Sequence, residues 1–157
     1  MTLEQKIGQF FFPAVFINDT EENIQETERL IKEYNIGGLT FFHSRASAAT
    51  NYETKKKVVL NDDSYHKLKE LIVRYQKCAT TPLLISIDAE WGLSMRLDST
   101  YRYPWNMTLG AIQDLKLIEK VGEKMGKESK RMGIQFNFAP VLDINTNPKN
   151  PINLLYI

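Results

Sequence analysis

Short apolar runs alternate along this chain with longer segments of helical periodicity, and this alternation limits the fold more than any other feature. The apolar runs, each typical of a buried strand, are residues 10–16, 39–42, 83–87 and 135–139. Apolar side chains recur every three to four residues, the spacing of one helix face, in residues 20–34, 61–78 and 114–132. Strands that alternate with amphipathic helices predict βαβ units, and therefore an α/β fold with a parallel sheet covered by helices.

Residues that favour helix ends mark the boundaries of the predicted helices. Thr2 and Gln5 fit a capping box, in which the hydroxyl accepts from the Gln5 N–H while the Gln5 side chain reaches back. Thr20 and Asp114 are expected to be the N-caps of two longer helices. Gly133 follows the last periodic residue, at the position where a left-handed backbone ends many helices.

Three further local expectations follow from the same patterns. The short first helix should turn Ile7 and Phe10 inward, and the glycines at 37–38 should end the second helix. Gly122 and Gly126 lie one turn apart on the last helix, where the absence of side chains would let that helix approach its neighbour closely.

Composition excludes several classes of protein. At 157 residues, 43% of them hydrophobic, the chain can build one core, so residues 1–157 are treated as a single domain. Lys+Arg 20 against Asp+Glu 19 leaves a net charge of +1, with no electrostatic footprint for nucleic acid or an anionic membrane. No apolar stretch approaches the roughly 18 residues of a membrane span, and the N-terminus lacks the regions of a signal peptide. We therefore expect a cytoplasmic protein with neither nucleic acid nor membrane as partner.

Polar residues cluster where the third and fourth predicted strands end. The third strand is followed by Asp88, Glu90 and Arg96, and the fourth leads to Asp143. Ligands bind beyond the carboxyl ends of the strands in parallel α/β folds, so Asp88 and Asp143 are expected to line one pocket. Carboxylates accept hydroxyl protons, Arg donates to oxygen, and an aromatic face such as that of Trp91 covers C–H surface. This combination suits a neutral polyol.

Other interpretations of these residues stay open at this point. An Asp after a strand is often a helix cap or a loop brace, and Trp91 and Trp105 are more often core residues than sugar platforms. His43 is expected to be an ordinary loop histidine. Asp88, Glu90 and Asp143 have the chemistry of a site for a hard divalent cation, but the intervening Arg96 argues against a metal. The sequence shows no phosphate loop, dinucleotide fingerprint or GxSxG elbow, and no cofactor is predicted.

Four ordered motifs lie at residues 1–9, 87–96, 103–111 and 137–145. They resemble, in this order, four segments of glycoside hydrolase family 3. These are the opening of its catalytic domain, its Ile-Asp-x-Glu-x-Gly…Arg segment, its Phe/Tyr-Pro…Met-x-Leu-Gly-Ala turn and its Asn-x-Ala-Pro-Val-x-Asp-x-Asn segment. The branch of the family that this chain resembles most is that of the bacterial β-N-acetylhexosaminidases.

The resemblance implies a TIM (β/α)₈ barrel that hydrolyses O-glycosyl bonds and releases terminal β-linked N-acetylglucosamine from cell-wall fragments or related small glycans. By the same resemblance, Asp88 and Arg96 bind the non-reducing sugar, and Asp143 supports the pocket. Glu90 belongs to the same motif. Trp91 stands where the family more often has Gly, which leaves substrate preference open and makes β-glucosidase an alternative activity.

The segments of the family that carry the nucleophile and the acid/base pair have no counterpart in this sequence, so no catalytic residue is expected within it. A barrel of eight strands takes roughly 250 residues, and the sequence predicts only the first four βα units. We therefore expect an incomplete barrel, the N-terminal part of a hydrolase that is inactive alone. Its cause is expected to be a truncated gene, a frameshift or an incomplete gene model. The alternative is a non-catalytic half-barrel that binds glycan or self-associates through its open edges.

Overall fold

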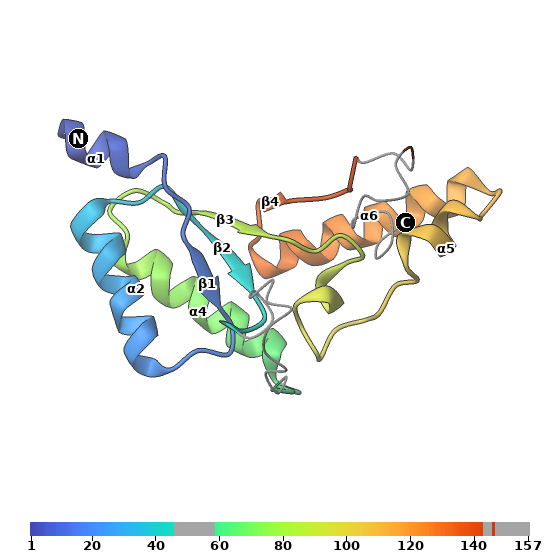
Figure 1. Cartoon of the computed structure of the whole chain (residues 1–157), viewed down its shortest axis with the longest axis horizontal. Helices are drawn as coiled ribbons and strands as arrows, with labels where there is room; N and C mark the ends of the chain where they lie inside the picture. The colour runs from blue at the N-terminus through green and yellow to red at the C-terminus, as the bar shows by residue number, and fades with distance from the viewer. Residues whose placement is uncertain (46–58, 143–145, 147–157) are drawn as a thin grey trace.

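The computed structural model describes residues 1–45, 59–142 and 146, and these residues form an α/β fold around one parallel sheet (Figure 1). The strands are β1 (Ala14–Phe16), β2 (Gly38–Phe42), β3 (Leu84–Ile87) and β4 (Phe136–Asn137). Their spatial order, β1-β2-β3-β4, follows the chain, and every neighbouring pair is parallel. The predicted fold class is confirmed, and this strand order is the one that successive βα units of a barrel produce.

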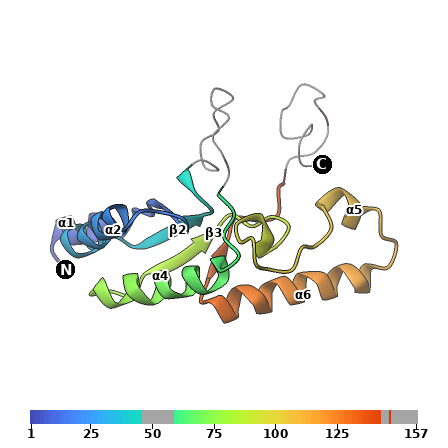
Figure 2. The ribbon, with the colours of Figure 1, turned by 90° about the horizontal axis from the view of Figure 1, so that it is seen from below.

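Helices precede the sheet and connect its strands. They are α1 (Leu3–Gly8), α2 (Glu21–Tyr34), α4 (Ser64–Cys78), α5 (Asn106–Gly110) and α6 (Leu115–Met132), with a 3₁₀ turn, η1 (Leu93–Met95). Figure 2 shows α4 and α6 on the same side of the sheet. α2 packs beside α4, and Arg74 on α4 joins the two helices through ion pairs of 2.6 Å to both Glu21 and Glu28. α5 and η1 were not predicted.

The core lies between β1–β3 and the helices α2 and α4. Its fully buried side chains include Ile24, Ile31, Leu39, Phe41, Leu68, Leu71, Tyr75, Ile85 and Ile87. The helical members of this set lie on the apolar faces of α2 and α4 that the three- to four-residue spacing predicted, and the others belong to the apolar runs predicted as strands. Burial raises the pKa of Tyr75 to about 12, because the phenolate would have to form inside this apolar layer.

Most of the predicted helix ends are confirmed, and the exceptions have local causes. The Thr2–Gln5 capping box forms, and the side chains of Thr20 and Asp114 accept N–H bonds at the starts of α2 and α6. Gly133 ends α6 with φ 92°. α2, however, ends at Asn35 in the left-handed conformation and not at the glycines of 37–38. Those glycines instead allow the chain that follows α1 to pass close to residue 37, since a Cβ on residue 37 would lie 2.0 Å from the Gln9 carbonyl oxygen.

The first strand is shorter than the apolar run that predicted it. Pro13 has no N–H to give to the ladder, and pairing with β2 begins at Ala14. The residues before it run outside the sheet, so Phe10 is 85% exposed and Ile7 also faces outward. The expectation that Ile7 and Phe10 point inward is therefore wrong for the residues that the structure describes.

The α6 side of the sheet is loosely covered. The expectation that Gly122 and Gly126 bring α6 close to a neighbour is wrong, because no described atom lies within 4 Å of a Cβ built on either glycine. A cavity of about 920 Å³ lies there, lined by residues of α6, by Glu90, by α5 and by residues around β4. β4 itself stops at Asn137, because the Ala139 N–H turns back to the Asn137 carbonyl.

Candidate functional site

Asp88 and Arg96 form an ion pair at the carboxyl end of β3. Arg96 lies just beyond η1, and its Nη2 donates to Asp88 Oδ2 at 2.6 Å while its Nε donates to the Asp88 carbonyl at 2.7 Å. The guanidinium also stands 4.9 Å from the centre of the Phe42 ring on β2, and its side chain is only 11% exposed. The predicted approach of Asp88 and Arg96 is confirmed. Asp88 is not a helix cap, since Gly92 holds the cap position of η1.

Asn137 on β4 fixes the backbone next to Asp88. Its Oδ1 accepts the Ala89 N–H at 2.9 Å, and its Nδ2 donates to the Ala89 carbonyl at 3.0 Å. At the end of β3 these two side-chain hydrogen bonds take the place of backbone pairing between β3 and β4. They hold the turn that carries Asp88 against β4. No role was predicted for Asn137, although a polar amide in the middle of the predicted strand 135–139 was a visible signal.

A tight turn follows Asp88 and requires glycine. Gly92 has φ 92°, and a Cβ on it would lie 2.7 Å from the Tyr103 ring. Tyr103 is buried there, and its hydroxyl donates to Glu128 on α6 at 2.8 Å. Burial, followed by the adjacent Glu128 carboxylate, raises the pKa of Tyr103. The loop between β3 and α5 is thus anchored to α6.

Glu90 is a half-buried carboxyl in this turn, with properties different from those of Asp88. Its Oε2 is buried without a hydrogen-bond partner among the described residues. Burial raises the pKa of Glu90, repulsion from Asp88 adds to the increase, and the nearby Arg96 opposes it. The site therefore pairs an ion-paired carboxylate with a carboxyl group that retains its proton more readily, and a protonated carboxyl both donates and accepts hydrogen bonds.

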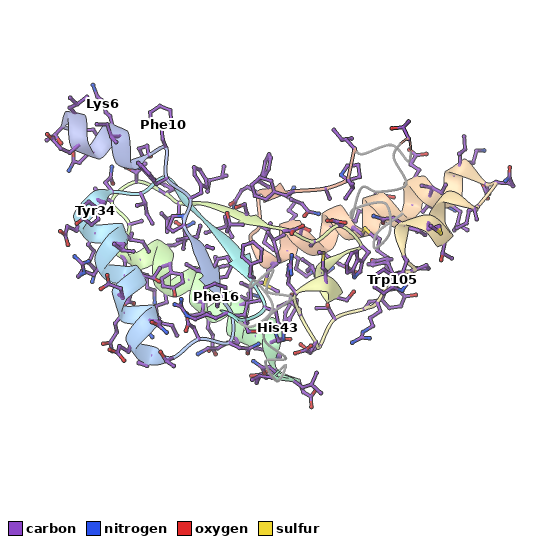
Figure 3. All side chains as sticks on the ribbon, viewed as in Figure 1. Lys6, Phe10, Phe16, Tyr34, His43 and Trp105 are labelled. Atoms are coloured by element: carbon purple, nitrogen blue, oxygen red, sulfur yellow. The ribbon has the colours of Figure 1, made fainter. Side chains whose placement is uncertain are left out.

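Two tryptophans meet beside this turn. The ring centres of Trp91 and Trp105 lie 4.7 Å apart with an interplanar angle of 42°. Trp105 lies on the segment that leads into α5 (Figure 3) and is 59% exposed, so its interpretation as a core residue is wrong. Trp91 is half-buried. Aromatic surface is therefore available next to Glu90 in the described part of the chain.

His43 belongs to a buried polar network at the end of β2 (Figure 3), and not to an ordinary exposed loop. It is 5% exposed, and its Nε2 lies 2.8 Å from Asp98 Oδ2. The same Asp98 oxygen accepts the Asn61 N–H at 2.8 Å, and Asn18 Nδ2 donates to the His43 carbonyl at 3.1 Å. Burial alone would raise the pKa of Asp98, but hydrogen bonds from His43 and the Asn61 N–H outweigh burial and lower it. The network ties together the chain after β1, β2 and η1.

Asp143 lies outside the described residues, so its expected place opposite Asp88 stays a prediction. Among residues 1–45, 59–142 and 146, no group of three or more His, Cys, Asp or Glu side chains is arranged to hold a metal ion. Within the same ranges, no helix is both long enough and apolar enough to cross a membrane.

Comparison with known sequences identifies relatives over most of the chain. Residues 2–154 match the family described as "Glycosyl hydrolase family 3 N terminal domain". A "Beta-hexosaminidase A" of Pseudoalteromonas piscicida is 30% identical over 132 residues, which cover 81% of this chain and 20% of that protein. A "Beta-N-acetylglucosaminidase/beta-glucosidase" of Cellulomonas fimi is 35% identical over 149 residues, covering 95% of this chain and 22% of that protein. The chain thus spans about a fifth of the length of these relatives.

Comparison with solved structures identifies the fold. The crystal structure of NagZ from Neisseria gonorrhoeae in complex with zinc ion superposes with a TM-score of 0.54 at 24% sequence identity. The match covers 85% of this chain and 37% of that one. NagZ has a TIM barrel. The parallel sheet described above, with its strands in chain order, is therefore an incomplete TIM barrel built from the first four βα units, as predicted.

Proposed function

Because the chain belongs to glycosyl hydrolase family 3, we propose that it is the N-terminal part of a glycosidase that hydrolyses O-glycosyl bonds. We propose further that this glycosidase releases terminal β-linked N-acetylglucosamine from small glycans or cell-wall fragments. The names of the relatives support this choice of sugar, since both include a hexosaminidase or N-acetylglucosaminidase activity.

The single observation that carries the proposal is the Asp88–Arg96 ion pair at the carboxyl end of β3. Asp88 keeps 28% of its side chain exposed while Arg96 holds one of its oxygens, so the carboxylate remains able to accept a sugar hydroxyl. Arg96 occupies Oδ2 and the carbonyl, which fixes the direction of the carboxylate before any ligand arrives. A preordered acceptor of this kind loses little conformational entropy when it binds a hydroxyl.

Glu90 and Trp91 extend the proposed subsite. The raised pKa of Glu90 favours its protonated form, and a protonated carboxyl can donate to a sugar oxygen as well as accept from a hydroxyl. Trp91 follows directly and offers apolar surface to the C–H face of a pyranose. We assign Asp143 the supporting role that its motif in the family implies. Asp88, Glu90, Trp91, Asp143 and Arg96 form the proposed substrate-binding site, and none of the five performs the bond cleavage.

We propose that residues 1–157 bind sugar without cleaving it. A retaining glycosidase needs two carboxyl groups about 5 Å apart on either side of the scissile bond. Asp88 is engaged by Arg96, and Glu90 belongs to the same turn, so this pair does not provide a free nucleophile facing an acid across a bond. The sheet of the described residues holds four strands, half of a barrel.

The proposal is tested by measuring binding and turnover on the same 157-residue protein. N-acetylglucosamine should bind to the parent and not to an Asp88→Ala variant, and aryl N-acetyl-β-glucosaminide should not be hydrolysed. An aryl β-glucoside is tested in parallel, because the Cellulomonas fimi relative also carries the name beta-glucosidase. Turnover that disappears in a Glu90→Gln variant would show that this turn is catalytic, and the absence of sugar binding would contradict the proposed subsite.

A further inference from the structure

The segment that follows η1 connects the ends of two neighbouring strands. Arg96 donates to Asp88 at the end of β3, and two residues further along the chain Asp98 contacts His43 at the end of β2. Between them Leu97 is 1% exposed, so the middle of the segment is fixed in the core. Because β2 and β3 are parallel neighbours, the two polar contacts lie at the same edge of the sheet.

The contact between His43 and Asp98 lies next to the contact between Arg96 and β2. The Arg96 guanidinium stands 4.9 Å from the centre of the Phe42 ring, and His43 is the residue after Phe42. The His43–Asp98 pair and the Phe42–Arg96 pair therefore join the same two segments. Loss of the His43–Asp98 bond would free the segment after η1 on the side where Arg96 packs.

His43 is held in place from the opposite side by the chain that follows β1. Its carbonyl accepts the Asn18 N–H at 3.0 Å and the Asn18 side-chain amide at 3.1 Å. Asn61 completes the arrangement, because its side chain donates to Asn18 Oδ1 at 2.6 Å and its N–H donates to Asp98 at 2.8 Å. His43 therefore has a fixed position, and the bond from its Nε2 fixes Asp98 in turn.

The chemistry of the His43 ring points to a role besides stability. The Asp98 carboxylate can only accept, so we assign the ring proton to Nε2. Nδ1 is buried and has no hydrogen-bond partner among the residues that the structure describes. A buried polar atom without a partner lowers stability, a cost that an apolar side chain of similar size would avoid. What histidine provides here, and an apolar residue would not, is the bond to Asp98.

We propose that His43 and Asp98 are a positioning pair for the sugar subsite, which holds the segment after η1 in the place where Arg96 orients the Asp88 carboxylate. This inference rests on the proposed function and deepens it, because it names two residues that set the affinity of a site without binding the sugar themselves. A carboxylate that is oriented before the ligand arrives loses less entropy on binding than one that the ligand must order.

Two amide variants of His43 test the pair, because they carry the same chemical group at different reach. His43→Gln places an amide N–H where Nε2 stands and can still donate to Asp98, whereas the side chain of His43→Asn is too short to do so. We expect the affinity for N-acetylglucosamine to fall about tenfold in His43→Asn and to stay within about threefold of the parent in His43→Gln.

The Nε–H group of Arg96 gives a second measurement that needs no sugar. It donates to the Asp88 carbonyl at 2.7 Å, and the Arg96 side chain is 11% exposed, so its hydrogen should exchange slowly and give a sharp NMR signal. The signal is assigned by its loss in Arg96→Lys. We expect it to broaden in His43→Asn and to stay sharp in His43→Gln.

Ser99→Ala is the matched control on the same segment. The Ser99 hydroxyl accepts the Tyr65 N–H at 3.0 Å and lies 3.0 Å from the Ser64 hydroxyl, so the substitution removes hydrogen bonds to α4 and leaves those to β2 in place. It should change neither the sugar affinity nor the Arg96 signal. Should His43→Asn fail to fold, Asp98→Asn replaces it, and both measurements should change in the same direction because the charge that His43 donates to is lost.

The outcomes for the two proposals differ. If the parent and His43→Asn bind the sugar equally and the Arg96 signal stays sharp, the positioning pair is refuted while the Asp88 subsite stands. If the parent itself binds no sugar, the proposed function fails, and the pair has no subsite to position. If Ser99→Ala changes both measurements as much as His43→Asn, the segment acts as a whole and the assignment to His43 and Asp98 is wrong.

Discussion

Asp88 forms an ion pair with Arg96 and is also proposed to bind a sugar hydroxyl. Replacing Asp88 by alanine allows the effect on stability and the effect on sugar binding to be measured separately. In the Asp88→Ala variant the Arg96 guanidinium, 11% exposed, keeps the backbone carbonyl and the Phe42 ring but loses its carboxylate. We expect the free energy of unfolding to fall by about 1–3 kcal/mol, the cost of leaving a buried polar group without its partner.

Urea unfolding of the Asp88→Ala variant measures this cost, and sugar binding is measured on the same sample under folding conditions. Asp88→Asn is the matched control, because it keeps the shape and one acceptor oxygen. A variant that unfolds like the parent yet has lost sugar affinity would show that Arg96 does not depend on Asp88 for stability.

Glu90 gives the fold a pH dependence that Glu90→Gln should remove. Its folded-state pKa is raised above the ordinary value of 4.5 by burial and by repulsion from Asp88. The folded state therefore holds the proton more tightly than the unfolded chain does, so this contribution to stability is complete below pH 4.5 and is lost as the pH rises through the raised pKa. We expect Glu90→Gln to be more stable than the parent at neutral pH and to lose that advantage near pH 4. Melting temperatures of the parent and of Glu90→Gln between neutral pH and pH 4 test this expectation, and identical pH profiles of the two proteins would contradict it.

Asp98 should show the opposite dependence. Its folded-state pKa is lowered below the ordinary value of 3.8, so its contribution to stability is present above that pH and is lost as the pH falls through the lowered pKa. Asp98→Asn removes the negative charge from the group that accepts from His43 and the Asn61 N–H, and we expect a loss of about 1–3 kcal/mol at neutral pH. The difference in free energy of unfolding between the parent and Asp98→Asn should become smaller as the pH falls below 3.8.

A second Asp–His pair provides the control for Asp98. Asp63 and His66 on α4 form a pair at 2.6 Å, but both side chains are exposed. Asp63→Asn should therefore cost less than about 1 kcal/mol. If Asp98→Asn and Asp63→Asn lower the free energy of unfolding equally, burial of the His43–Asp98 pair does not explain how much the network stabilises the fold.

At the scale of elements, α6 offers a prediction that reverses the expectation from its sequence. Gly122 and Gly126 were expected to permit close helix packing, but a Cβ at either position meets open space. Gly122→Ala should therefore stabilise the protein by about 0.5–1 kcal/mol, the intrinsic cost of glycine inside a helix. Gly38→Ala is the contrasting variant, since its Cβ would lie 2.2 Å from the Leu84 carbonyl oxygen, and it should destabilise. Thermal unfolding measures both, and a destabilised Gly122→Ala would mean that α6 packs more closely than described.

The elements that could be predicted from the sequence are those in which local signals agree. α2 and α6 have a capping residue, a periodic apolar face and a residue that ends the helix, and their starts were predicted correctly. β1 was predicted too long because an apolar run does not reveal which of its residues will be covered. Pro13 contributes only its carbonyl, which accepts the Thr40 N–H at 3.1 Å, and has no N–H to donate. α5 and η1 are single turns, too short to show a helical period.

The candidate site was predictable for a similar reason and to a similar extent. Asp88 and Arg96 come together because one ends a strand and the other returns from the following turn, which the motif spacing indicated. The hydrogen bonds of Asn137 to Ala89 and the burial of His43 depend on contacts between segments far apart in the chain. No local sequence pattern predicts such contacts. The exposure of Trp105 was missed because tryptophan is usually buried.

At the scale of the whole molecule, the sheet of the described residues has an edge at β1 and another at β4, each with unpaired backbone groups. Large apolar side chains are exposed at both ends of it. They include Phe10, Phe11, Phe136, Phe138 and Leu142. A second copy of the chain could pair with these edges and cover this surface.

We therefore predict that the 157-residue protein self-associates in solution. Sedimentation over a range of concentrations should show a species larger than 18.2 kDa whose fraction rises with concentration. Lysine at Phe136 and Phe138 should shift the equilibrium towards the monomer. Lysine at Val73, an exposed position on α4 outside the apolar surfaces at both edges, provides the control. A folded monomer that binds no apolar dye would contradict the prediction.

The central claim is that the carboxyl end of β3 in this family 3 chain is a sugar subsite built on Asp88 and Arg96. The most direct test maps the backbone N–H signals that move in an NMR spectrum of the 157-residue protein on addition of N-acetylglucosamine. We predict that the shifts concentrate in residues 87–97 and are lost in the Asp88→Ala variant. Shifts that concentrate elsewhere, or that persist without Asp88, would contradict the claim.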